Sequence, residues 1–234
     1  MLGSTTTVAD GVTMLSEFPR HAVNAYLLDH QDEDGAVLVD SGTRLWGRRL
    51  CRRVARLTED DGLAAHVLTH AHPDHQGSSA RVCERFDVPL RCHERDREAM
   101  ETGVLPPADP AAGAGFVQGL IAGPPHAVDE TLAEGDDVAG FEVVETPGHT
   151  PGHVSLWRER DGVLIAGDAL LNMDLRTTRS GLHEPARGFT SDPKEARRSI
   201  VKVADLEPDT VCFGHGPVLE DEGELAGFVA ALEE

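Results

Sequence analysis

Short apolar runs alternate with longer amphipathic runs along the 234 residues of the chain. This alternation is typical of a domain in which strands and helices follow one another. Eight runs rich in β-branched and aliphatic residues predict strands, at Ala25–Leu28, Ala36–Val39, Ala65–Thr69, Val88–Cys92, Phe141–Glu145, Val154–Trp157, Val163–Ala166 and Thr210–Phe213. Four amphipathic runs predict helices, at Leu45–Thr58, Ser78–Phe86, Lys194–Asp205 and Glu222–Leu232.

Turn and cap signals refine this pattern. Asp192 and Pro193 before the third predicted helix are typical of an N-cap followed by proline in the first turn. Short turns such as Asp34-Gly35 predict antiparallel pairing of the early strands and argue against a purely parallel sheet. Residues 103–125 are rich in Gly, Ala and Pro, but the motifs described below lie on both sides of them. We therefore interpret 103–125 as an insertion, a flap or a short helix near a site, within one domain that covers residues 1–234.

The chain is strongly acidic, with 41 Asp and Glu against 21 Lys and Arg and a formal net charge of −20. A surface of this sign repels phosphates, so binding to DNA or RNA is disfavoured without a local basic patch. Almost all of the basic residues are arginines, and both salt adaptation and a GC-rich genome would explain that bias.

Features that would direct the chain to a membrane or to export are not evident. No apolar run approaches the roughly 20 residues that a membrane span requires, and the first eight residues do not resemble a signal peptide. The four cysteines have neither a C-x-x-C spacing nor a secretory context, so we interpret them as small buried hydrophobic residues or inert thiols. These observations favour a soluble cytoplasmic protein, and the sequence does not indicate its oligomeric state.

The densest chemistry lies in Thr69–Gly77, which reads T-H-A-H-P-D-H-Q-G. It follows a predicted strand, and His70 and His72 project to the same side because side chains alternate along an extended chain. The next residue, Pro73, ends the extended run and places Asp74 and His75 at the start of a helical turn. Imidazole and carboxylate groups are common ligands of Zn²⁺ and related divalent ions. The segment therefore predicts a metal site, with a polar or pH-sensing surface patch as the alternative.

Three further motifs also follow predicted strands. They are T-P-G-H-T-P-G-H at Thr146–His153, A-G-D-A-L at Ala166–Leu170 and F-G-H-G-P at Phe213–Pro217, and they offer His149, Asp168 and His215 as ligands. Each candidate ligand lies beside glycines, which let the backbone turn tightly at a crowded site. Ligands at the ends of several strands would be held by a rigid scaffold, as a preorganised site requires.

This ordered set, H-x-H-x-D-H followed by His, Asp and His, resembles that of the metallo-β-lactamase-fold hydrolases from about Asn24 to Pro217. The resemblance implies an α/β protein with a four-layer αββα sandwich, in which two mixed sheets pack face to face and helices flank them. It also implies two divalent metal ions, zinc foremost, with iron or manganese as alternatives. By the family's pattern, one ion would be held by His70, His72 and His149 and the other by Asp74, His75 and His215, with Asp168 bridging the two.

A few other residues are candidates for supporting roles. Asp40, in the V-L-V-D-S-G segment, is a candidate to orient a ligand histidine, and an ordinary turn aspartate is the alternative. His153 is expected to be structural and hydrogen-bonded near the site. Asp74 is the candidate catalytic group, which would orient the nucleophile or pass a proton to the leaving group. The loop after Asp168 is either a solvated loop or part of the substrate pocket, in which case it would contribute Asn172, Arg176, Arg179 and His183.

The resemblance implies a hydrolase in which a hydroxide shared by two metal ions attacks an electrophilic carbon or phosphorus. The T-P-G-H-T-P-G-H stretch and Asp168 are similar to the glyoxalase II-like branch, so we expect a small ester, thioester or lactone as substrate, and neither nucleic acid nor membrane as partner. Only 19 residues follow His215, whereas glyoxalase II has a further helical region that binds glutathione, which disfavours glutathione thioesters. The alternatives are a mononuclear iron oxygenase resembling the persulfide dioxygenases, and a phosphodiesterase or β-lactamase of the same superfamily.

Overall fold

The first half of the chain forms a seven-stranded sheet in the computed structural model, which describes residues 4–17, 21–29, 35–58, 62–104, 120–220 and 223–232. The strands lie in chain order, β1 (Thr5–Ala9), β2 (Val12–Glu17), β3 (Val23–Leu28), β4 (Ala36–Val39), β5 (Leu63–Val67), β6 (Leu90–His93) and β7 (Glu130–Leu132). The first four pair antiparallel and the last four pair parallel. The parallel strands are connected through α1 (Gly47–Leu57), α2 (Pro73–Gln76), α3 (Ser79–Phe86) and α4 (Glu94–Thr102).

The second half forms a six-stranded sheet. Its spatial order is β15 (Leu219–Glu220), β14 (Thr210–Phe213), β11 (Val163–Gly167), β10 (Val154–Arg158), β9 (Phe141–Glu145) and β8 (Asp137–Val138). Only β11 and β14 pair parallel, and the rest pair antiparallel. A separate hairpin of β12 (Leu171–Met173) and β13 (Ser180–His183) follows β11. This half also contains the helices α6 (Pro193–Ala204) and α7 (Glu224–Leu232) and the 3₁₀ turns Glu159–Asp161 and Arg187–Phe189.

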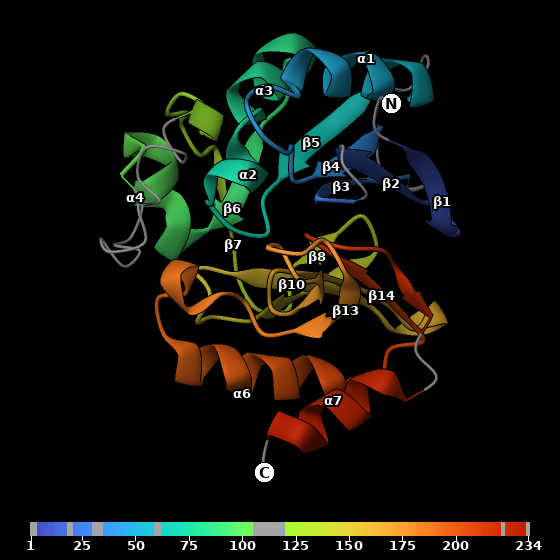
Figure 1. Ribbon diagram of the computed structural model, residues 1–234. Coiled ribbons are helices and arrows are strands. Elements are labelled where there is room, and N and C mark those ends of the chain that lie inside the picture. Colours follow the sequence, from blue (N-terminus) through green and yellow to red (C-terminus); the bar gives the residue numbers. More distant parts are fainter. Residues whose placement is uncertain are drawn as a thin grey trace.

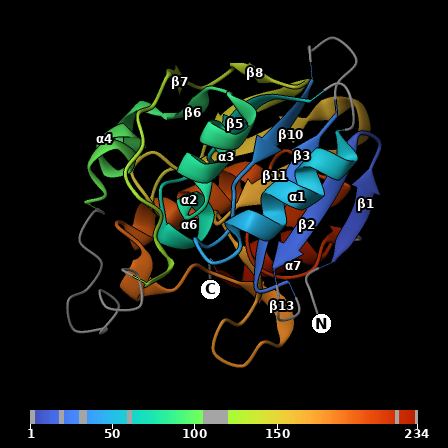
Figure 2. The ribbon, with the colours of Figure 1, turned by 90° about the horizontal axis from the view of Figure 1, so that it is seen from above.

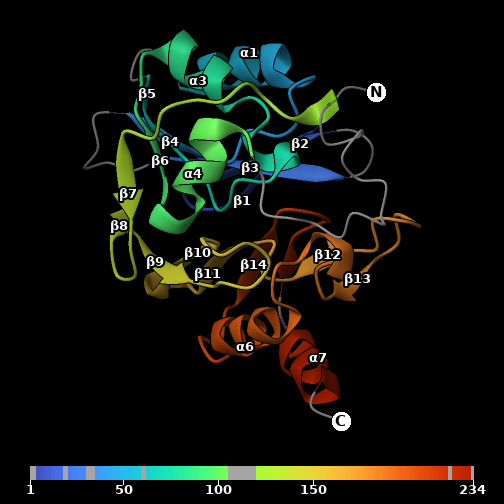
Figure 3. The same ribbon diagram turned by 90° about the vertical axis from the view of Figure 1, so that its left-hand side faces the viewer.

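The two sheets pack face to face between two layers of helices (Figure 1). α1 and α3 cover the outer face of the first sheet, and α6 and α7 cover the outer face of the second (Figure 3). Seen from above, α1 and α3 lie over the strands of the first sheet (Figure 2). The expected αββα sandwich of two mixed sheets is confirmed.

Side-chain alternation along the strands explains why this sandwich forms. In β4, Val37 and Val39 face the core between the sheets, whereas Ala36 and Leu38 face α1 and α3. The strand β11 does the same between the central core and the outer helices of the second sheet. Because strands covered on both faces bury every side chain, they are recognisable in the sequence as continuous apolar runs.

All eight predicted strands and four predicted helices are present, with ends shifted by up to two residues. The sequence did not reveal the strands β1, β2, β7, β8, β12, β13 and β15 or the helix α4, whereas α2 contains the helical turn expected at Asp74 and His75. Of the 103–125 insertion, residues 105–119 lie outside the described residues, and the carbonyl of Ile121 accepts a hydrogen bond from the Arg44 amide at 2.8 Å. Among the helices described, none combines the length and apolar composition that a membrane span requires.

Candidate metal centre

The seven candidate ligands lie just beyond the ends of four strands, at one edge of the sandwich. His70 and His72 follow β5, His149 follows β9, Asp168 follows β11 and His215 follows β14, while Asp74 and His75 lie in α2. Pro73 begins α2 and His72 is its extended N-cap residue. The helix therefore turns Asp74 and His75 back toward the strand ends.

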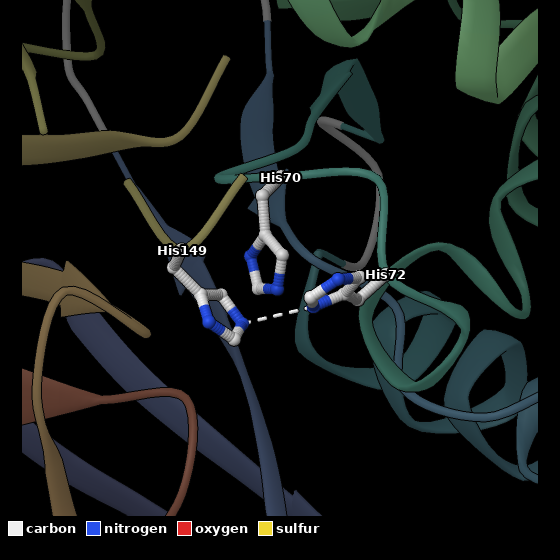
Figure 4. A group of neighbouring side chains, drawn as sticks. All are labelled: His70, His72 and His149. Atoms are coloured by element: carbon white, nitrogen blue, oxygen red, sulfur yellow. Dashed lines mark hydrogen bonds between the residues drawn. The ribbon is translucent and has the colours of Figure 1, made fainter. Parts of the chain in front are cut away.

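The first group consists of His70, His72 and His149, whose rings converge (Figure 4). His72 Nδ1 and His149 Nε2 are 2.8 Å apart. The ring of His70 lies edge-on to both neighbours, with centroid distances of 4.8 Å to His72 and 4.9 Å to His149. Three nitrogens therefore point into one small volume from two loops that are distant in the sequence.

The second group consists of Asp74, His75 and His215. His215 Nε2 lies 3.4 Å from His75 Nε2 and 3.4 Å from Asp74 Oδ2. Two donor atoms that bind the same tetrahedral Zn²⁺ ion lie about 3.3 Å apart. The spacing of the second group therefore matches that of donors around a single ion.

Asp168 reaches both groups. Its Oδ2 lies 3.5 Å from His149 Nε2 and 3.1 Å from His215 Nε2, and its Oδ1 lies 3.6 Å from His75 Nε2. This close packing requires glycine at position 214, because a Cβ there would lie 2.1 Å from Asp168 Oδ1.

Burial and charge both suit a divalent cation. Two buried polar atoms, His70 Nε2 and Asp168 Oδ1, have no hydrogen-bond partner within the described part of the chain, although each points into the cluster. Buried polar groups are almost always satisfied, so an orphaned pair in one cluster indicates a missing partner. A metal ion between the groups would satisfy both atoms, and the set of imidazole and carboxylate donors fits zinc, iron and manganese.

The pKa values divide the histidines into two kinds. Burial lowers the pKa of His70 and His149 well below the ordinary value and also lowers the pKa of His72, so these rings are neutral and available as ligands. Burial is the largest influence on His75 and His215 and by itself would lower their pKa, but the neighbouring carboxylates together outweigh it and raise the pKa of both rings. These carboxylates are Asp168 and Asp40 for His75, and Asp168 and Asp74 for His215. A cation bound beside Asp168 would displace the protons that this carboxylate otherwise attracts.

Hydrogen bonds orient the ligand rings. Asp40 Oδ2 accepts from His75 Nδ1 at 2.9 Å and from the Thr69 hydroxyl at 2.8 Å, and that hydroxyl lies 3.0 Å from His70 Nδ1. The carbonyl of Ala22 accepts from His215 Nδ1. In each of these rings the Nδ1 contact leaves Nε2 directed at the cluster. Asp40 therefore lies where the sequence predicted a carboxylate that orients a ligand histidine.

The chain is similar to known proteins along most of its length. The model of the metallo-beta-lactamase superfamily matches residues 19–215. The chain belongs to this superfamily. YflN, a probable metallo-hydrolase of Bacillus subtilis, is 35% identical to this member over 212 residues, which cover 82% of this chain and 80% of the relative.

Two further comparisons bear on chemistry. A hydroxyacylglutathione hydrolase of Bdellovibrio bacteriovorus is 26% identical over 155 residues, 64% of this chain and 48% of that protein. The crystal structure of TTHA1623 in a di-iron-bound form has a TM-score of 0.64 at 28% identity, covering 99% of this chain and 97% of that one. The expected superfamily is confirmed, whereas the identity of the metal and the substrate stay predictions.

Asp96 is a buried residue of this superfamily member that the sequence did not single out. It lies at the start of α4, and its Oδ2 accepts from the Ala71 amide at 3.0 Å and the Thr150 hydroxyl at 2.7 Å. Its Oδ1 accepts from the Gly152 amide at 2.7 Å. The carboxylate thus ties the loop of His70 and His72 to the loop of His149. One signal was available, because Asp96 also lies just past an apolar strand at the same edge.

Asn24 has a similar function for the His215 loop. Its side-chain amide donates to the carbonyls of Phe213 at 3.0 Å and Gly216 at 2.8 Å, and its backbone amide donates to Gly214. His153 is hydrogen-bonded near the site, as expected: its Nε2 accepts from the Asp168 backbone amide at 2.9 Å, which fixes the backbone that carries this carboxylate.

The loop after Asp168 forms the β12–β13 hairpin. Asn172 uses both ends of its amide within this region, donating to the Pro217 carbonyl at 3.0 Å and accepting from the Gly181 amide at 3.2 Å. Arg176 and Arg179 are exposed in the turn, and His183 is half-buried on β13. Among the described residues, no side-chain hydrogen bond or ion pair joins any of these four residues to the candidate ligands, although the Asn172 backbone amide donates to the His215 carbonyl at 3.0 Å. Their role in substrate binding stays a prediction.

Proposed function

We propose that this protein is a dinuclear metal hydrolase that cleaves a small ester, thioester or lactone. The observation that carries the proposal is the position of Asp168, whose two oxygens lie 3.1–3.6 Å from nitrogens of both histidine groups. A mononuclear site would need only one of these groups. Here Asp74, His75 and His215 form a second complete set of donors.

The residues present would hold two ions, through His70, His72 and His149 on one side and Asp74, His75 and His215 on the other, with Asp168 between them. When bound, two such ions lower the pKa of a water molecule toward neutrality and polarise the electrophile of the substrate. Zinc is the first choice for this donor set, and iron is the principal alternative because the related TTHA1623 structure is di-iron-bound.

Asp74 is the best-placed group for moving a proton. Its side chain is 27% exposed, whereas that of Asp168 is 5% exposed. Asp74 therefore lies on the open side of the cluster, where a substrate can reach it, and its Oδ2 is 3.4 Å from His215 Nε2. We propose that Asp74 orients the attacking water, accepts a proton from it, and then passes that proton to the leaving oxygen or sulfur.

The ester or thioester preference rests on the relative named hydroxyacylglutathione hydrolase. That match spans only 48% of the relative, so we extend the bond type and not the glutathione group to this chain. Arg176 and Arg179, exposed on the neighbouring hairpin, are proposed to contact the acidic part of a small substrate.

Metal analysis and a substrate panel test this proposal. Protein purified without added metal should contain about two divalent ions per chain, and Asp168→Asn should lower that number. Asp136→Asn, an exposed turn residue that accepts from the Ala133 amide at 2.8 Å, is the matched control. A panel of chromogenic esters, thioesters, lactones and phosphodiesters should show chelator-sensitive turnover of one of the first three classes. One iron per chain, or turnover of phosphodiesters alone, would refute the proposal.

A further inference from the structure

A cleft between α1 and α3 gathers positive charge on a strongly acidic protein. Its volume is about 680 Å³. Arg48, Cys51, Arg52 and Ala55 of α1 and Arg81, Glu84 and Arg85 of α3 line it. The two helices lie side by side on the outer face of the first sheet (Figures 1 and 3). None of the seven candidate metal ligands lines the cleft, so it is separate from the metal centre.

The local sequence is opposite in charge to the rest of the chain. Residues 41–58, which include α1, contain six arginines and no acidic residue, although the whole chain has a net charge of −20. A helix needs polar groups on its exposed face, but glutamate would serve this purpose equally well. The concentration of arginine on α1 therefore calls for another explanation.

The four arginines of the cleft are not neutralised by neighbours. Five other arginines, Arg91, Arg95, Arg97, Arg158 and Arg197, pair with carboxylates. Within the described ranges, no ion pair involves Arg48, Arg52, Arg81 or Arg85, even though Glu84 lines the same cleft. All four are exposed. Arg52 Nε donates to the Arg48 carbonyl at 3.2 Å, and the Arg85 guanidinium lies 5.4 Å from the centroid of the Phe86 ring. Neither contact neutralises the charge, so the four guanidinium groups can pair with an anionic ligand.

Helix geometry arranges the four groups in two facing pairs. Arg48 and Arg52 are four residues apart on α1, and Arg81 and Arg85 are four apart on α3, so each pair lies on one helix face. The helices approach closely at Gly47, where a Cβ would lie 2.7 Å from Ser78 Oγ and 2.9 Å from Arg81 Cδ. Between the pairs, the buried Cys51 and half-buried Ala55 give the cleft a partly apolar floor.

We propose that this cleft binds a phosphorylated small molecule of nucleotide size. The planar fork of arginine matches phosphate oxygens, and two facing pairs suit a ligand with more than one phosphate charge. The volume lies within the range of about 300–1,000 Å³ that small-molecule sites occupy, and the apolar floor suits an organic group. A long nucleic acid would extend beyond the cleft onto the acidic surface, which would repel it.

Calorimetric titration of the metal-loaded protein with ADP at low ionic strength tests the proposal. Arg52→Gln combined with Arg85→Gln should weaken ADP binding about tenfold or more, because each arginine provides a charge-assisted hydrogen bond. Arg49→Gln combined with Arg56→Gln is the matched control, since it removes the same charge from exposed positions of α1 outside the cleft. The control should change ADP affinity by less than about twofold. Both double variants should keep the hydrolytic rate of the parent protein.

Several outcomes would overturn the proposal. Equal weakening by both double variants would indicate a general electrostatic field and not a site. Unchanged ADP binding by the Arg52→Gln and Arg85→Gln protein would place the nucleotide at the metal centre or elsewhere. Absence of ADP binding at millimolar concentration would also refute the proposal. This holds even if single-stranded RNA were found to bind through the same arginines.

Discussion

Asp96 connects the two loops of the first metal group, and replacing it tests how the centre is held. Asp96→Asn keeps the shape of the side chain but changes one acceptor oxygen into an NH₂ donor. The parent carboxylate accepts from two backbone amides and one hydroxyl, at 2.7–3.0 Å. In either orientation of the asparagine side chain, its NH₂ group faces the backbone amide of Ala71 or of Gly152, and that amide loses its acceptor.

The cost can be worked from these contacts. Asp96 is 1% exposed, so water cannot replace the lost acceptor, and leaving one buried donor unsatisfied costs about 1–3 kcal/mol. Asp96→Ala leaves three donors without a partner and should cost about 4 kcal/mol or more. Because the donors belong to the loops of His70, His72 and His149, part of this loss should be seen as weaker metal binding.

Urea unfolding of metal-free and metal-loaded protein separates the two effects. Asp96→Asn should lower the free energy of unfolding in the metal-free state and also lower the metal affinity measured by chelator competition. Asp136→Asn should change neither, because its carboxylate is exposed to water. If Asp96→Asn had the unfolding free energy and metal affinity of the parent, the reasoning about the two loops would be refuted.

Three further predictions follow from single positions. Burial lowers the pKa of His66 from its ordinary 6.5 to about 4, so the unfolded chain binds the extra proton and stability falls as the pH drops from about 6.5 toward 4. Between about pH 7.5 and about pH 5.5 the parent should lose about 1.4 kcal/mol more than His66→Gln in urea melts, and equal losses would contradict this assignment. Gly214→Ala would place a Cβ 2.1 Å from Asp168 Oδ1. It should lower the free energy of unfolding by about 1–3 kcal/mol and also lower the metal content. The control Gly227→Ala, whose Cβ would have no atom within 4 Å, should leave the thermal melt unchanged. Asp40 has a φ of 57°, which asparagine tolerates, so Asp40→Asn should leave the backbone intact but weaken metal binding about 10- to 100-fold in chelator competition; a parental affinity would show that its contact with the ring is dispensable.

The sequence was a good guide to strands that are apolar on both faces and a poor one to the edge, hairpin and very short strands. Strands such as β4 and β11 are covered on both faces, so their residues are all apolar and the run is visible. β1 reads Thr-Thr-Thr-Val-Ala and is mostly exposed, and β15 has only two residues. Such strands owe their conformation to pairing with a neighbour, which leaves little trace in local composition.

The candidate ligands were evident for a similar reason. A histidine or aspartate directly after an apolar strand, beside glycine, combines chemistry with a scaffold in one short segment. Asp96 had only part of this signal, because it follows a strand but has no glycine beside it, and Asn24 lies within a strand. The function of both residues lies in hydrogen bonds to loops that are distant in the sequence. The arginine cleft was missed because its two halves lie on separate helices, Gly47–Leu57 and Ser79–Phe86.

The amino-acid sequence by itself determined the superfamily, the layered fold and the types of side chain that meet at the strand ends, since periodicity and motif order are local properties of the chain. Only the tertiary structure decided which oxygens of Asp168 face which histidines, which carboxylates hold the rings and loops, and where unpaired arginines face one another. These relations are distances between segments far apart in the sequence, and they depend on how two sheets and their helices pack.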